Sequence, residues 1–68
     1  MLKLEIHIKG DLNVQWSEWF DGLTIYHSDP GMTVLTGQVR DQAAIYGLVS
    51  RLRDLGLTLI SLNCEEIP

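Results

Sequence analysis

The first residue to examine for chemistry is His7, which lies between Glu5 and Lys9 in an alternating stretch. A histidine can serve as a general base or bind a metal ion. A working base needs an orienting partner, and no second ligand stands at a fixed spacing from His7. We therefore interpret His7 as a solvated histidine on the wet side of a strand.

The remaining reactive side chains are equally isolated. His27 and Asp29 flank a turn, and two ligands are too few for zinc, which takes three or four. Cys64 is the only cysteine and has no histidine near it in sequence. A cysteine nucleophile needs a lowered pKa and a pocket. We expect Cys64 to be a small, half-buried hydrophobic residue.

The motifs that mark common enzymes and metal sites are absent from this sequence. It has no glycine-rich nucleotide loop, no paired-cysteine zinc motif and no serine nucleophile motif. An enzyme built on His7 with Glu5 or Tyr26 is disfavoured, because 68 residues leave little room for a closed pocket. We expect no catalytic residue, no metal and no cofactor.

Hydrophobic periodicity predicts the elements that hold these residues. Leu2, Leu4, Ile6 and Ile8 alternate with polar residues, which is typical of a strand with one buried face. Apolar residues at helical spacing predict one long helix, and glycine and proline mark the turns. The predicted elements are strands at 2–9, 23–27, 32–39 and 57–63, a short helix between Asn13 and Gly22, a turn at 28–31, and a helix at 42–55 capped by Asp41.

The element order is strand, helix, strand, strand, helix, strand. Right-handed crossovers turn this order most simply into a ferredoxin-like α+β sandwich. We expect one domain over residues 1–68, with a four-stranded antiparallel sheet of order 4-1-3-2 beneath two helices. Residues 65–68 are expected to form a frayed tail. One face of the sheet is then left uncovered.

Strand alternation places an apolar group on the uncovered face. Tyr26, Met32, Val34 and Leu59 fall there together and are our candidate interface residues. The same alternation points Leu35, Gly37 and Val39 inward. An ordinary solvated face with a few apolar residues is the alternative.

Aromatic and small residues indicate where elements approach each other. Trp16, Trp19 and Phe20 are expected to fill the core, but a helix this short cannot bury all three, so we expect Trp16 to be partly exposed. An inward Gly37 would admit a helix or a tryptophan close to the sheet. Gly47 also suggests a close approach, and Arg51 is expected to pair with Asp54 three residues later.

Composition excludes several classes of partner. Nine acidic and five basic residues give a net charge of −4, which argues against nucleic acid and anionic membrane surfaces. No apolar stretch approaches the ~20 residues of a membrane span. A lone cysteine is typical of a reducing compartment, so we expect a cytoplasmic protein. Dimerisation is the remaining means by which so small an acidic chain can bury more surface.

Two stretches carry a resemblance to a known family. They are WSEWFDGLTI at 16–25 and TVLTGQVRDQAAIYGLVSRLRDLGL at 33–57. They resemble a family of short bacterial hypothetical proteins of unknown function and about this length. The resemblance implies a stand-alone bacterial protein and assigns no catalytic residue.

Two functions are therefore weighed. The first is a non-enzymatic interaction module that forms a homodimer or binds a protein partner. The second is a small-ligand sensor similar to the ACT-like regulatory domains, which share this element order and bind amino acids. In that alternative the ligand would lie near Gly10 and Trp16. The resemblance to ACT-like domains is one of fold only.

Overall fold

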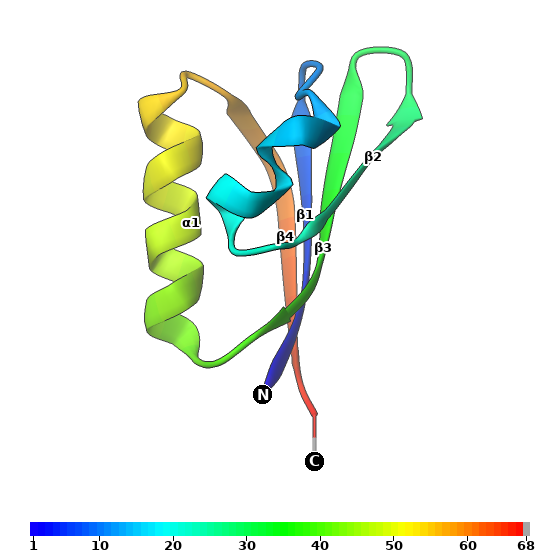
Figure 1. Ribbon diagram of the computed structural model, residues 1–68. Helices are drawn as coiled ribbons and strands as arrows, with labels where there is room; N and C mark the ends of the chain where they lie inside the picture. The colour runs from blue at the N-terminus through cyan, green and yellow to red at the C-terminus, as the bar shows by residue number, and fades with distance from the viewer. Residues whose placement is uncertain (68) are drawn as a thin grey trace.

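A computed structural model describes residues 1–67 of the chain, and it shows an antiparallel sheet with both helical segments on one side (Figure 1). β1 begins and β4 ends at the same end of the sheet (Figure 1). No helix in residues 1–67 has the length and apolar character needed to cross a membrane. The elements are β1 (Leu2–Lys9), the 3-10 helix η1 (Val14–Phe20), β2 (Thr24–Asp29), β3 (Met32–Val39), α1 (Gln42–Asp54) and β4 (Thr58–Glu66).

The sheet has four strands in the order β2-β3-β1-β4, and every neighbouring pair is antiparallel. Read from the β4 edge, this order is 4-1-3-2. The expected α+β class and the four-stranded antiparallel sheet are therefore confirmed, with one main helix, α1. β1 lies at the centre and pairs with β3 and β4 along all eight of its residues. β2 and β4 form the two edges.

The core lies between the sheet and the helical layer. β1 contributes Leu4, Ile6 and Ile8, which are fully buried. The predicted inward residues of β3 are in place, because Leu35, Gly37 and Val39 pair with β1 residues of this face. The remaining core side chains come from the loop after β1, from η1, from the turn before β2, from β2 and from α1. They are Leu12, Phe20, Leu23, Ile25, Ile45, Leu48 and Leu52.

Both helical segments differ in detail from the sequence prediction. Asn13 caps the first as expected, accepting a hydrogen bond from the Gln15 amide. This segment is a 3-10 helix of seven residues, which is too short to be stable without packing. Asp41 caps α1 as predicted, but the helix ends at Asp54. Leu55, expected on the core stripe, is the C-cap and is exposed.

The second and last strands extend beyond their predicted ends. β2 reaches Asp29, so the turn narrows to Pro30 and Gly31, with φ +79° at Gly31. The frayed tail expected from residue 65 is wrong at Glu65 and Glu66, which pair with β1. The Ile67 amide donates to the Met1 carbonyl at 3.0 Å. Pro68 lies outside the described residues.

Two glycines received different neighbours from those expected. A Cβ at Gly37 would lie 2.8 Å from Leu23 Cδ2, so a leucine, and not a helix or a tryptophan, uses the space. A Cβ at Gly47 would meet nothing within 4 Å. The close approach predicted at Gly47 is therefore wrong.

Candidate interaction surface

The uncovered face carries a row of side chains across all four strands. The register places Tyr26, Val34, His7 and Ser61 side by side on it. Val34 is fully buried and Met32 is half-buried, while Tyr26 is exposed. Three of the four predicted interface residues thus lie on this face, but Val34 adds no accessible surface to it.

Leu59, the fourth predicted interface residue, does not follow the expected alternation. Ser61 pairs with His7, whereas Leu59 pairs with Ile8, because the register shifts between these positions. This bulge leaves Ile60 without a partner on β1. A bulge inserts one residue and reverses the alternation beyond it. Leu59 is therefore in register with a core-face residue of β1 and not with the open face.

The two histidines make local contacts. His7 Nε2 lies 3.2 Å from Glu5 Oε1, and both side chains are half exposed. Ser61 lies opposite His7 in the register, but no third group is bonded to the pair among the described residues. His27 Nε2 bonds the Leu12 carbonyl oxygen at 3.0 Å. In residues 1–67 no three His, Cys, Asp or Glu side chains gather as a metal site.

Gly10, a predicted ligand-binding residue, has both of its backbone polar groups bonded within the chain. Its amide donates to the Gly31 carbonyl at 2.5 Å. Its carbonyl accepts from the Thr33 hydroxyl at 2.6 Å, and the same hydroxyl oxygen accepts from the Leu12 amide at 3.2 Å. This network fixes the loop between β1 and η1. A ligand using the Gly10 backbone would have to displace these bonds.

Trp16, the other predicted ligand-binding residue, belongs to a cluster of three aromatic side chains. Its ring meets that of Trp19 edge-to-face at 5.3 Å, and Trp19 meets Phe20 at 5.1 Å. The expected partial exposure of Trp16 is confirmed, but Trp19 is exposed as well, so only Phe20 fills the core. These edge-to-face contacts account for the aromatic cluster as internal packing.

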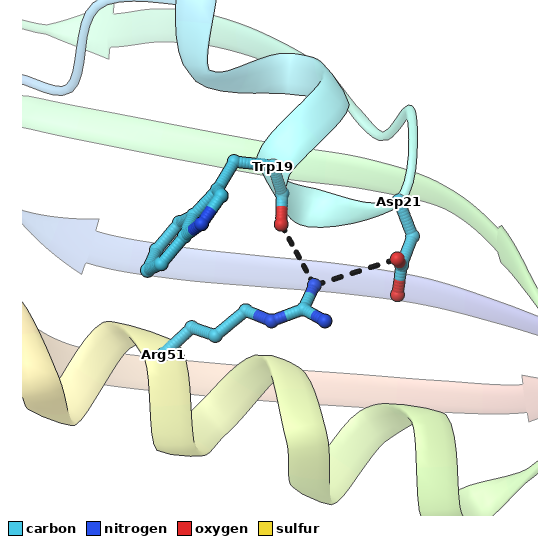
Figure 2. A network of polar contacts seen from close by, with 3 residues as sticks. All are labelled: Trp19, Asp21 and Arg51. Carbon is cyan, nitrogen blue, oxygen red and sulfur yellow. Dashed lines mark hydrogen bonds and ion pairs between the residues drawn. The ribbon is translucent and has the colours of Figure 1, made fainter.

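Arg51, on α1, bonds to the segment that carries these aromatic residues (Figure 2). Its guanidinium donates to the Trp19 carbonyl at 2.7 Å and to the Asp21 carboxylate at 3.4 Å. It also lies 5.8 Å from the centre of the Trp19 ring. The predicted pairing of Arg51 with Asp54 is therefore wrong, because the backbone carbonyl offers a tertiary partner. Asp54 instead meets Arg53.

The edge formed by α1 and β4 combines exposed apolar side chains with a strand that is paired on one side only. Tyr46 is 69% exposed, Ile60 52% and Leu59 42%. A groove of about 240 Å³ runs between α1 and β4. It is lined by Gln42, Ile45, Tyr46, Val49, Leu62 and Cys64. We call this set, together with Leu59 and Ile60, the α1–β4 edge.

Sequence reasoning missed most of the α1–β4 edge. Tyr46 and Ile60 were assigned no role, and Cys64 was expected to be half-buried but is exposed. The signal that could have found the edge is the stretch 58–64, which contains no charged residue in an acidic chain. Such a stretch on an edge strand favours pairing with another chain.

Comparison with known proteins gives one match. No curated protein and no solved structure matches the chain. The model of a domain of unknown function, DUF8691, matches residues 3–63. This range runs from β1 into β4 and includes the aromatic residues of η1, Arg51 and every residue that lines the groove except Cys64. The chain therefore belongs to the DUF8691 family of domains of unknown function.

Proposed function

We propose that this protein is a non-enzymatic self-association module that forms a homodimer through the α1–β4 edge. The observation that carries the proposal is the composition of β4. This edge strand is uncharged from Thr58 to Cys64 and flanked by an apolar groove, within a chain of net charge −4. An acidic molecule meets a second copy of itself with least repulsion where its own surface lacks charge.

The opposite edge of the sheet supports this choice by contrast. β2 has six residues, carries Asp29, shows a register shift beside it and is followed by Pro30. Short length and a following proline discourage strand addition at β2, whereas β4 shares the bulge and the acidic end, with a register shift at Ile60 and Glu65 and Glu66 as its last residues. β4 has nine residues and contains no proline or lysine. The two edges therefore differ in the length of the strand and in the proline that follows β2.

The size of the chain also favours association. The protein has one cysteine, which is exposed and free. A chain of this length gains little margin from its own core, and a dimer interface adds apolar burial. The free thiol suits the reducing cytoplasm. We further infer a ferredoxin-like arrangement in which η1 takes the place of the first α-helix.

Sedimentation equilibrium of the purified full chain tests the proposal. We expect a dimer, and we expect Ile60→Lys to shift the population to monomer, because each copy would then bring a charged side chain into an edge that is otherwise uncharged from Thr58 to Cys64. The matched control is Thr24→Lys, which changes an exposed residue of the β2 edge. This control should remain dimeric. Circular dichroism establishes that both variants are folded.

Three results would overturn the proposal. One is a monomer at every concentration. Another is a dimer that Ile60→Lys leaves intact. The third comes from native mass spectrometry of protein from its own cells: an added mass that is not a second copy would point to another partner, or to the ligand-sensing alternative.

A further inference from the structure

We propose that two copies join β4 to β4 in an antiparallel register centred on Leu62. The two four-stranded sheets then continue as one eight-stranded sheet. This inference rests on the proposed self-association and adds its geometry. The two-fold axis passes through the paired Leu62 residues and is perpendicular to the sheet, so both α1 helices lie on the same side.

The backbone of β4 is suited to this pairing. β4 bonds to β1 on one side, and no strand within residues 1–67 lies on its other side. Its outward amide and carbonyl groups are a template for a further strand. An antiparallel partner satisfies them without a connecting segment, which matches the need of two separate chains.

Side-chain matching favours the register at Leu62. Leu62 is the midpoint of β4, which spans Thr58–Glu66. In this register Leu62 faces Leu62 of the second copy, Ser61 faces Asn63, and Ile60 faces Cys64. Leu62 pairs with Ile6 and so lies on the helix side, whereas Ser61 and Asn63 lie on the open face. Within the seam, which we define as residues 60–64, apolar side chains therefore meet apolar ones and polar side chains meet polar ones. Beyond the seam, Leu59 faces Glu65 and Thr58 faces Glu66.

Charge separation excludes registers closer to the chain end. Centring on Leu62 separates Glu65 of one copy from Glu65 of the other by six residues, roughly 20 Å. This separation exceeds the Debye length of ~8 Å at physiological salt. Centring on Cys64 would reduce the separation to two residues, about 7 Å, so that the carboxylates repel.

The groove between α1 and β4 is continuous with this seam, because Leu62 and Cys64 line it. Pairing at Leu62 places the grooves of the two copies side by side on the helix side. The contact between the two leucines then covers the floor of each groove. Tyr46, which lines the groove and is 69% exposed, lies beside this contact.

Disulfide trapping tests the register. In a Cys64→Ser background, Leu62→Cys places two thiols directly opposite each other, with Cα atoms ~4.5–5.5 Å apart, within disulfide range. Ile60→Cys with native Cys64 should cross-link for the same reason. Wild-type Cys64 should not, since its two copies lie four residues apart, roughly 13 Å. Thr24→Cys with Cys64→Ser is the matched control on the β2 edge.

We expect most of the Leu62→Cys chain to run as a covalent dimer on a non-reducing gel, and the wild type and the control to run as monomers. Ready cross-linking of wild-type Cys64 would overturn the Leu62 register. A dimer in sedimentation that neither cysteine variant traps would overturn this geometry and leave the proposed function standing. A monomer in sedimentation would overturn both.

Discussion

At the scale of single residues, the Thr33 hydroxyl shows how one polar group fixes the entrance to η1. It is fully buried, donates to the Gly10 carbonyl and accepts from the Leu12 amide. A buried polar group without a partner costs ~1–3 kcal/mol. The hydroxyl therefore keeps two loop groups satisfied where water does not reach.

We expect Thr33→Val to lower the free energy of unfolding by about 1–3 kcal/mol, because the replacement has the same shape and leaves both backbone partners unmatched. Urea denaturation at a fixed protein concentration measures the loss. The control is Thr24→Val on the exposed β2 edge, which should change stability by less than about 0.5 kcal/mol. Equal effects in the two variants would contradict the role assigned to the hydroxyl.

Gly37 and Gly47 form a second pair for comparison. Gly37→Ala places a Cβ 2.8 Å from Leu23 Cδ2, and such overpacking should destabilise the fold by about 1–3 kcal/mol. Gly47→Ala meets open space in a helix, and it should stabilise by about 1 kcal/mol through helix propensity. Thermal unfolding of both variants checks the opposite signs. A stabilising Gly37→Ala would mean that Leu23 can move aside without cost.

At the scale of elements, Arg51 connects α1 to η1 across the helical layer. η1 is a 3-10 helix of seven residues with no stability of its own. Phe20 is buried in the core, and the Arg51 side chain donates a hydrogen bond to the Trp19 carbonyl of η1. Because the guanidinium is partly exposed, its contribution to stability is small, about 1 kcal/mol or less.

We expect Arg51→Ala to loosen η1 more than it unfolds the protein. The tryptophan emission should shift to longer wavelength, and the η1 amides should exchange faster with solvent. Arg53→Ala is the matched control, because among the polar contacts of the described residues the Arg53 side chain meets only the exposed Asp54. An emission spectrum unchanged in Arg51→Ala would show that Phe20 alone holds the segment.

The elements also show which features the sequence could predict. β1 and β3 were predicted with their observed ends. The buried residues of β1 alternate strictly. Burial in β3 does not alternate, since Thr33, Val34 and Leu35 are all buried, but the Pro30-Gly31 turn marks where this strand begins. β4 was not, because Glu65 and Glu66 look like a solvated tail until β1 is present to pair with them. The bulge at Ile60 leaves no mark on the alternation, so Leu59 was assigned to the other face. The α1–β4 edge was missed for the same reason, because which residues are exposed there depends on how β4 pairs with β1.

At the scale of the whole molecule, net charge opposes dimerisation and the contacts at the β4 edge favour it. The protein carries a net charge of −4, so two copies repel at long range. The proposed seam at Ile60–Cys64 contains no charged residue that could form ion pairs across it. Attraction along the seam then comes from strand pairing and apolar contact, which salt does not screen.

Because salt screens the repulsion and not the apolar contact, the dimer Kd should depend on salt in a predictable direction. Raising the salt from about 0.01 M to about 0.15 M shortens the Debye length from ~30 to ~8 Å, so the repulsion weakens while the seam is unaffected. We expect the dimer to become tighter, with a lower Kd, in sedimentation equilibrium at the two salt concentrations. A dimer held by opposite charges would weaken instead. Replacing Glu65 with Gln should reduce the salt effect, since it removes one repelling charge from each copy near the seam. A dimer that dissociates as salt rises would place the interface on a charged face of the molecule and not at β4.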